Sequence, residues 1–293
     1  MRVAGVRHPG RSHWALLAAA CCLLASLTAC GLPPEAGGAQ RGLLDLVRSS
    51  GELRIGHSPD FPPMEYLDNT GNPVGADVDL GRALAEQMGL RPVFSKQSFA
   101  QLINSVRTLR VDIVLSGLSD TVARQQTLDF VDYFGTRGRL YTLGAKAGQF
   151  TTPDQACGKT VAVSKSTDYF GQVQAFDKQY CGGAGRPAIS VLGTDSGAAA
   201  RLQLQQGRAD LAVQGEENLV FFRKQDPNAF SPVLDPLPAK PFAVAIKTGE
   251  PAMTEAVYQA FTELVRSGRY KEILDRWQLG YGAITPTING VKN

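Results

Sequence analysis

The stretch VDIVLSGLSDTVARQQTLDFVDYF, residues 111–134, decides the fold class. Its first seven residues have the character of a buried strand, which then breaks into small and hydroxyl residues followed by Arg124. The break has two interpretations. Thr121 can cap a short helix whose first turn exposes Arg124 to solvent, or the donors beyond the strand end can bind a small anion. Both interpretations place a strand directly before a helix, which is the repeating unit of an α/β fold.

Strands and helices alternate on both sides of this stretch. Strands are expected at 53–57, 111–117, 160–164, 209–215 and 242–247. Apolar residues keep a three-and-four spacing from Met253 to Val265 and again from Tyr270 to Trp277, which predicts two helices. The sequence therefore predicts an α/β protein whose sheets are covered by helices on both faces.

Two compact units are expected along the chain. One extends to about residue 142 and the other covers about 148–238. The C-terminal segment is either a third piece or a return to the first unit, and the pattern alone leaves both open. The segments 141–146 and 236–244 carry Gly or Pro and are the candidate crossings between units.

The composition is that of a globular chain without a nucleic-acid-binding surface. Hydrophobic residues make up 43% of the 293 residues and charged residues 19%. Of the 30 Lys and Arg, the arginines Arg2, Arg7 and Arg11 lie at the extreme N-terminus, and the remaining 27 equal the 27 Asp and Glu. A balanced charge predicts no nucleic-acid partner.

Residues 1–29 are predicted to be an export signal. A basic head precedes the apolar run 14–27, which is short for a membrane-spanning helix. The run ends in LTAC, residues 27–30, which resembles the lipobox of bacterial lipoproteins, in which the cysteine thiol takes a diacylglycerol and the new N-terminus is acylated, commonly with palmitate. A plain cleaved signal with an incidental Cys30 is the alternative. The resemblance implies a protein anchored to the extracytoplasmic face of a membrane, with residues 30–43 as a flexible tether.

Export determines how the remaining cysteines are interpreted. Once the signal and Cys30 are set aside, Cys157 and Cys181 remain, and two cysteines in an oxidising compartment are predicted to pair. With three histidines in the whole chain, a metal site is not expected, and no cofactor is predicted.

The order of motifs over residues 44–281 resembles the family 3 solute-binding proteins of ABC transporters, which bind polar amino acids. The segments that carry the resemblance are SPDFPPMEYLDNTGNPVGADVDLGRALAEQMGL, the stretch quoted above, GKTVAVSKSTD, GRADLAV and FAVAIKTGEPAMTEAVYQAFTELVRSGRYKEILDRWQL. The resemblance implies a monomer with the type II periplasmic-binding fold, which has two lobes and a ligand cleft between them. Lobe 1 is then expected at 44–142 plus 243–293 and lobe 2 at 143–242, with hinge crossings near 141–147 and 236–244.

The resemblance also assigns roles to residues at the strand ends. It implies that Arg124 grips a ligand α-carboxylate together with donors on the same strand end and a pair on the second lobe, and that an aromatic residue lines the cleft. Without the resemblance, Phe61 fits a core position and 166–167 a surface loop. The expected ligand-binding residues are Asp60, Phe61, Gly117, Ser119, Thr121, Arg124, Ser166, Thr167, Asp168, Gln214 and Glu216.

One departure from the family concerns the ligand's ammonium group. The family usually carries an aspartate just past the strand, where this chain has Gly215, flanked by Gln214 and Glu216. Glu216 or Asp168 can take the role, or the ligand lacks a normal α-amino group. Asp120 also lies beside the expected carboxylate site and would repel an anion unless its side chain points away.

The favoured function is an extracytoplasmic lipoprotein that binds a small polar, carboxylate-bearing ligand and delivers it to an ABC permease. An enzyme on the same fold, similar to cyclohexadienyl dehydratase, is the alternative, with Glu65, Asp60, Asp120 or Glu216 as acid or base. A sensor component that presents the ligand to a receptor is a third possibility. The mature chain has a single histidine and offers neither a Ser-His-Asp nor a Cys-His catalytic set. We therefore expect a protein that is not an enzyme.

Overall fold

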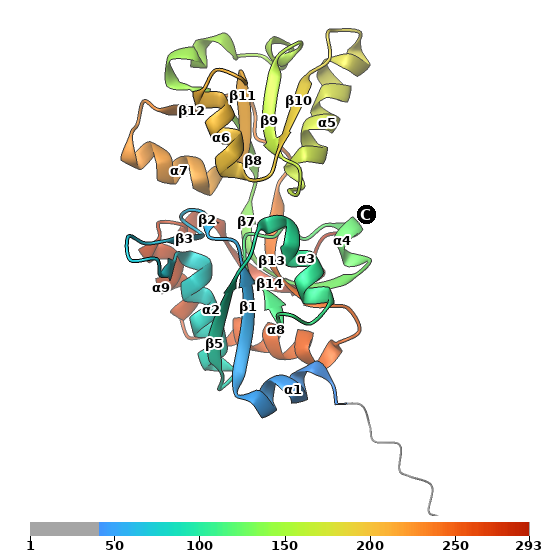
Figure 1. Ribbon diagram of the computed structural model, residues 1–293, viewed down its shortest axis with the longest axis vertical. Helices are drawn as coiled ribbons and strands as arrows, with labels where there is room; N and C mark the ends of the chain where they lie inside the picture. The colour runs from blue at the N-terminus through green and yellow to red at the C-terminus, as the bar shows by residue number, and fades with distance from the viewer. Residues whose placement is uncertain (1–40, 293) are drawn as a thin grey trace, which may run out of the picture. The chain divides into compact units, whose positions relative to one another are not determined.

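The computed structural model describes residues 41–292, which form two lobes of sheet and helix (Figure 1). The sheet of lobe 1 contains β1 (Glu52–His57), β5 (Arg91–Lys96), β6 (Ile113–Val114), β7 (Leu128–Thr136), β13 (Lys240–Lys247) and β14 (Ala283–Ile288). Their order across the sheet is β14-β7-β13-β6-β1-β5. The sheet of lobe 2 contains β8 (Gly138–Leu143), β9 (Thr160–Ser164), β10 (Ser190–Thr194), β11 (Leu211–Gly215) and β12 (Phe230–Pro232), in the order β10-β9-β11-β8-β12. The predicted α/β class is confirmed.

Helices and short strands complete each lobe. Lobe 1 has α1 (Leu43–Ser50), α2 (Ala76–Gln87), α3 (Phe99–Arg107), α4 (Val122–Gln125), α8 (Pro251–Arg266) and α9 (Arg269–Arg276). It also has a small sheet of β2 (Asp60–Phe61), β3 (Glu65–Leu67) and β4 (Pro73–Val74). Lobe 2 has α5 (Tyr169–Tyr180), α6 (Gly197–Gln205) and α7 (Glu216–Gln225). Single 3-10 turns are η1 (Gly144–Gln149), η2 (Pro153–Ala156), η3 (Gly182–Ala184) and η4 (Gly280–Gly282).

The C-terminal segment returns to lobe 1. β13 pairs antiparallel with both β6 and β7, and the two helices expected near the C-terminus are α8 and α9. The apolar stripe of α8 enters the lobe 1 core through Met253, Val257 and Phe261, each fully buried. Gly268 ends this helix in the left-handed conformation at φ 80°, which glycine adopts without steric cost.

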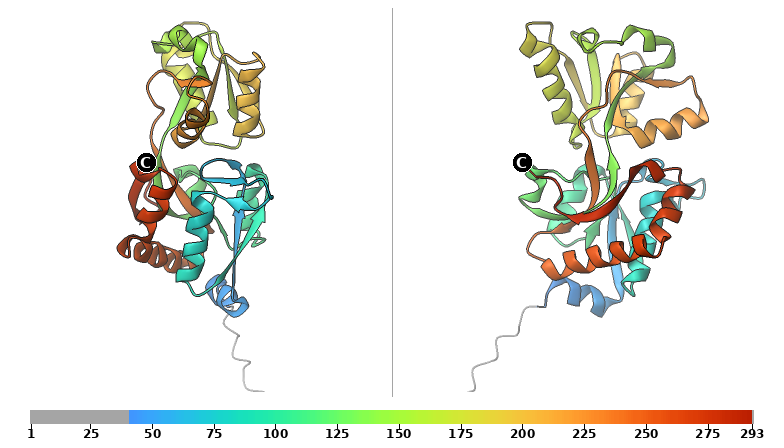
Figure 2. Two further views of the ribbon diagram at one scale, coloured as in Figure 1. Left: turned by 90° about the vertical axis from the view of Figure 1, so that its left-hand side faces the viewer. Right: turned by 180° about the vertical axis from the view of Figure 1, so that it is seen from behind.

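Two chain segments connect the lobes side by side, as both views of Figure 2 show. The first passes through Arg137, between β7 and β8, whereas the sequence predicts a crossing at 141–147. The difference arises because residues 138–141 already pair with β11 and residues 141–143 with β12, so β8 belongs to the lobe 2 sheet. The second segment lies just before β13, whose first residue, Lys240, pairs with Thr136.

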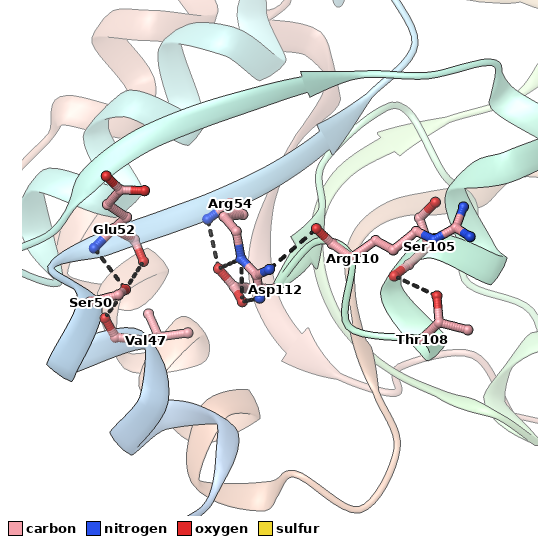
Figure 3. Close-up of polar contacts among 8 residues, drawn as sticks. All are labelled: Val47, Ser50, Glu52, Arg54, Ser105, Thr108, Arg110 and Asp112. Atoms are coloured by element: carbon pink, nitrogen blue, oxygen red, sulfur yellow. Dashed lines mark hydrogen bonds and ion pairs between the residues drawn. The ribbon is translucent and has the colours of Figure 1, made fainter.

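A buried carboxylate at the start of β6 holds the end of the lobe 1 strands that is remote from the cleft (Figure 3). Asp112, 2% exposed, accepts a hydrogen bond from the Arg54 backbone N–H at 2.7 Å and others from the Arg54 guanidinium. Arg54 lies in β1 and Asp112 immediately precedes β6, so these bonds align the two parallel strands. The alignment fixes where β6 ends, and therefore where Ser116 begins the loop described below.

Lobe 2 contains the predicted disulfide between Cys157 and Cys181. The bond joins the segment before β9 to the end of α5, across a sequence separation of 24 residues. Because the cross-link restricts the unfolded chain, the Cys157→Ser/Cys181→Ser variant is expected to lose about 3 kcal/mol of unfolding free energy. Urea unfolding with and without reductant measures the loss. Equal unfolding curves for the variant and the oxidised wild type would contradict it.

Several expectations fall outside the described residues. These are the signal peptide at 1–29, Cys30 and the greater part of the tether at 30–43. Among residues 41–292, no helix combines the length and the apolar character needed to cross a membrane.

Candidate ligand-binding site

A cavity lies where the strand ends of the two lobes face each other. Lobe 1 lines it with Asp60, Phe61, Phe99, Gly117, Ser119, Arg124 and Phe242. Lobe 2 lines it with Ser164, Thr167, Asp168, Tyr169, Ser196, Gly197, Val213 and Gln214. Most of these residues follow or end a strand. This is the usual position of a ligand site in open α/β sheets, where ligands bind beyond the carboxyl ends of the strands.

Arg124 spans the cavity from lobe 1 to lobe 2. Its Nη1 donates to the Ser119 carbonyl at 2.8 Å, and its Nη2 donates to the Ser166 carbonyl at 3.1 Å. The Thr121 hydroxyl oxygen accepts the Arg124 backbone N–H at 3.2 Å and caps α4. Thr121 therefore caps the helix, as one interpretation of the opening stretch expects, but Arg124 turns into the cavity instead of being exposed to solvent on the first turn. Burial lowers the pKa of Arg124 and the carboxylates of Asp168 and Asp120 oppose the shift; a guanidinium stays charged in proteins.

Asp168 places a carboxylate beside this arginine. Its Oδ1 accepts the Ser119 hydroxyl across the cleft at 2.8 Å, and its Oδ2 accepts Gln172 Nε2 at 2.6 Å. Asp168 immediately precedes α5, so its position follows from the start of that helix. A carboxylate has about four acceptor sites, so these two bonds leave room for a further donor.

The walls of the cavity on the lobe 1 side are aromatic. Phe61 and Phe242 meet edge to face with ring centroids 5.8 Å apart, and Phe99 lines the same side. Gly117 lies against this wall at φ 51°, and a Cβ there would be 2.7 Å from Cε1 of Phe61. The loop can approach the phenylalanine this closely because residue 117 has no side chain.

The remaining expected residues are divided between the cavity and its surroundings. Thr167 and Gln214 line the cavity, and Gln214 accepts the Tyr141 hydroxyl at 2.9 Å. Asp60 lines it from a more exposed position. Ser166 contributes its carbonyl to Arg124, and Thr121 acts as the helix cap; neither is among the residues that line the cavity.

Two acidic residues named from the sequence point elsewhere. Glu216 is not among the lining residues and pairs with Arg137 at 2.8 Å. Asp120 is fully buried and accepts Gln125 Nε2 at 2.8 Å and the Val291 backbone N–H at 3.2 Å. Asp120 therefore makes its hydrogen bonds to α4 and the C-terminal segment, and it does not line the cavity.

Sequence reasoning missed several residues that line the cavity. Phe99 begins α3 and Ser196 caps α6 by accepting the Ala199 N–H at 3.1 Å, so both looked like ordinary helix starts. Tyr169 and Phe242 have the pattern of core residues, and both are nearly fully buried. Only the Ser196 cap leaves a local signal, the Ser-Gly start of a helix.

Glu65, considered above as a catalytic residue, does not line the cavity. It is fully buried behind it, and its Oε1 accepts the Ser116 hydroxyl. Burial and the neighbouring Asp77 raise the pKa of Glu65 well above its ordinary value. Its contacts are those of a support for the loop rather than of an acid presented to a substrate.

The two lobes, the cleft at the strand ends and the bridging arginine define the class of extracytoplasmic solute-binding proteins. The family model described as bacterial extracellular solute-binding proteins, family 3, matches residues 53–280, and the chain belongs to this family.

Relatives in this family carry names of amino-acid-binding proteins. The Corynebacterium glutamicum arginine-binding protein ArgT is 30% identical over 244 residues, which cover 83% of this chain and 80% of the relative. The Escherichia coli putative ABC transporter arginine-binding protein 2 is 28% identical and covers 77% of this chain and 90% of its own. Both are named as binding proteins rather than enzymes.

Solved structures agree with the fold. An ancestral arginine-binding protein bound to arginine has a TM-score of 0.70 at 26% identity, covering 78% of this chain and 98% of its own. Holo ArgBP from T. maritima has a TM-score of 0.67 at 27% identity and covers 80% of this chain and 99% of its own. An ancestral amino acid-binding protein, a precursor of cyclohexadienyl dehydratase, is similar at a TM-score of 0.71 and 23% identity, which bears on the fold alone.

Proposed function

We propose that this chain is the binding protein of an ABC importer, that its ligand is an amino acid, and that L-arginine is the first candidate. The observation that carries the proposal is the pair formed by Arg124 and Asp168 in one cavity, with Ser119 bonded to both of them. A cation and an anion side by side match the adjacent carboxylate and ammonium of an α-amino acid. The names of the relatives support the ligand class.

Each half of the pair has a defined task. Arg124 keeps N–H groups beyond its two protein bonds and offers them to the ligand carboxylate. Asp168 receives the ammonium group. It is favoured over Glu216 because it lines the cavity, whereas Glu216 is paired with Arg137.

The far part of the cavity suits a flat cationic side chain. Phe61, Phe99 and Phe242 supply aromatic surface, on which a guanidinium stacks favourably. Asp60 adds a carboxylate on the same side of the cavity. Gln214 offers an amide, so glutamine is included among the ligands to be tested.

Isothermal titration with a small panel tests the proposal. L-arginine, L-lysine, L-glutamine and agmatine, which is arginine without its carboxylate, are titrated into the chain. L-arginine is expected to bind and agmatine to bind far more weakly, because agmatine offers nothing to Arg124. Agmatine binding as tightly as L-arginine, or no heat with any amino acid, would sink the proposal.

Closure of the two lobes around the ligand would prepare the protein to deliver that ligand to the permease. The segments through Arg137 and before Lys240 are the connections about which the lobes would rotate, and ligand bonds on both sides favour the closed form. A permease would then recognise the closed form at the membrane surface.

We assign the attachment of the protein to the membrane to the acyl chains on Cys30. Cys30→Ser is expected to release the protein from the membrane fraction, because the acyl chains supply the anchoring free energy. Cys21→Ser, which changes a cysteine within the signal, is the matched control and should leave the protein membrane-bound. Membrane fractionation followed by immunoblotting measures both. A Cys30→Ser protein that still sediments with membranes would contradict the anchor.

A further inference from the structure

The loop from Ser116 to Ser119, which faces the cavity, is held from behind by two buried carboxyl side chains. Asp77, in the first turn of α2, accepts the Gly117 backbone N–H with Oδ2 at 2.8 Å. Glu65, in β3, accepts the Ser116 hydroxyl with Oε1. Asp77 is 1% exposed and Glu65 is fully buried. Successive residues of the loop are therefore bonded to two different elements of lobe 1.

The backbone conformation of Gly117 restricts the direction in which its amide N–H bond points. Its φ of 51° is in the left-handed region, and Phe61 occupies the space where a side chain would project. The N–H accordingly points into lobe 1 and not into the cavity. An unpaired N–H at this buried position would be costly, so the acceptor behind it determines how the peptide is oriented.

Asp77 is itself held in place by a second donor. The Tyr133 hydroxyl donates to Oδ1 at 2.7 Å, so the two oxygens of Asp77 have separate partners. Within residues 41–292 no Lys or Arg side chain hydrogen-bonds to Asp77 or Glu65, and the nearby His57 has its pKa lowered to about 4 by burial. The cluster therefore works by directional hydrogen bonds rather than by ion pairing.

We propose that Asp77 is a positioning residue for the carboxylate half of the ligand site. By accepting the Gly117 amide, it sets the direction in which the loop leaves β6 and thus the place of Ser119, which bonds to Arg124 and Asp168. The same bond keeps Gly117 against Phe61. The effect on affinity rests on the proposed function, whereas the orientation of the loop does not.

Three variants separate positioning from a general loss of stability. Asp77→Ala removes the acceptor and is expected to weaken L-arginine binding by about tenfold. Asp77→Asn should stay within about threefold of the wild type, because its carbonyl oxygen still accepts the Gly117 N–H while its amide donates to the Tyr133 hydroxyl oxygen. Tyr133→Phe removes the other bond to Asp77 but leaves the acceptor of the Gly117 N–H, so it should lower the unfolding free energy and weaken binding less than Asp77→Ala does.

The amide of Gly117 provides a readout that needs no ligand. In the wild type, NMR should detect a scalar coupling across the hydrogen bond between the Gly117 amide nitrogen and the Asp77 carboxyl carbon. Its absence would overturn the proposal even if no variant folds. An Asp77→Ala protein with wild-type affinity would also overturn it, as would equal losses of affinity in Asp77→Ala and Tyr133→Phe. If the wild type binds no amino acid while the coupling is present, the proposed function fails and the loop assignment stands.

Discussion

Arg124→Ala is expected to abolish the rise in melting temperature that L-arginine gives the wild-type chain. Truncating one partner of a buried, hydrogen-bonded charge pair costs about 2–5 kcal/mol, which corresponds to a loss of affinity of about 30-fold or more. Because ligand stabilisation depends on the logarithm of ligand concentration over Kd, the shift almost disappears at about ten times the wild-type Kd, which nearly saturates the wild type. Differential scanning fluorimetry over a ligand series measures it.

Two controls make this result specific to the carboxylate grip. Arg124→Lys keeps the charge but loses the two-pronged geometry, so it should recover only part of the shift. Arg266→Ala removes an exposed arginine of α8 that pairs with Glu263 and does not line the cavity, and it should leave the shift unchanged. A full shift in Arg124→Ala would remove this residue from the site.

Asp168→Asn is expected to weaken L-arginine binding by about tenfold or more. The substitution keeps the size of the side chain but replaces the anion opposite the ligand ammonium with a neutral amide, and hydrogen bonds to charged groups contribute about 1.5–3 kcal/mol. Glu216→Gln makes the same chemical change at the other candidate position, where the carboxylate is bonded to Arg137, and should leave the Kd unchanged. Isothermal titration compares the two.

A ligand without the ammonium group completes the test. N-acetyl-L-arginine should bind the wild type weakly, and Asp168→Asn should not weaken it further, because the partner group is already missing. If Glu216→Gln loses affinity and Asp168→Asn does not, the ammonium lies at Glu216. Equal losses with L-arginine and N-acetyl-L-arginine would show that Asp168 acts on the cleft rather than on the ammonium.

Local sequence pattern was sufficient for several elements of the fold and for the cap of α4. The three-and-four spacing from Met253 to Trp277 predicts α8 and α9 because helix periodicity is a property of near neighbours. Thr121 is recognisable as a cap for the same reason, since its hydroxyl bonds to a backbone group three residues away. The pairing of Cys157 with Cys181 followed from the small number of cysteines left after export.

The crossing between lobes was not predictable at residue level. Residues 128–143 form one extended run, in which GTRGR at 135–139 separates two apolar parts; the first part pairs with β13 and the second with β11. A strand pattern shows that a residue is buried but does not identify the sheet that buries it. The change of sheet at Arg137 depends on partners about 70 to 120 residues away in sequence, at distances where periodicity carries no information.

The sequence by itself determined the α/β class, the two C-terminal helices, the helix cap at Thr121 and the strand end that carries Ser119 and Arg124. Only the tertiary structure decided which acidic side chain faces the cavity. Asp168 and Glu216 each lie at the start of a helix, and nothing local separates them. Asp168 meets Ser119 across the cleft, whereas Glu216 meets Arg137 outside the cavity. Secondary structure depends on neighbours in the chain, but the direction of a charged side chain depends on partners that folding brings together.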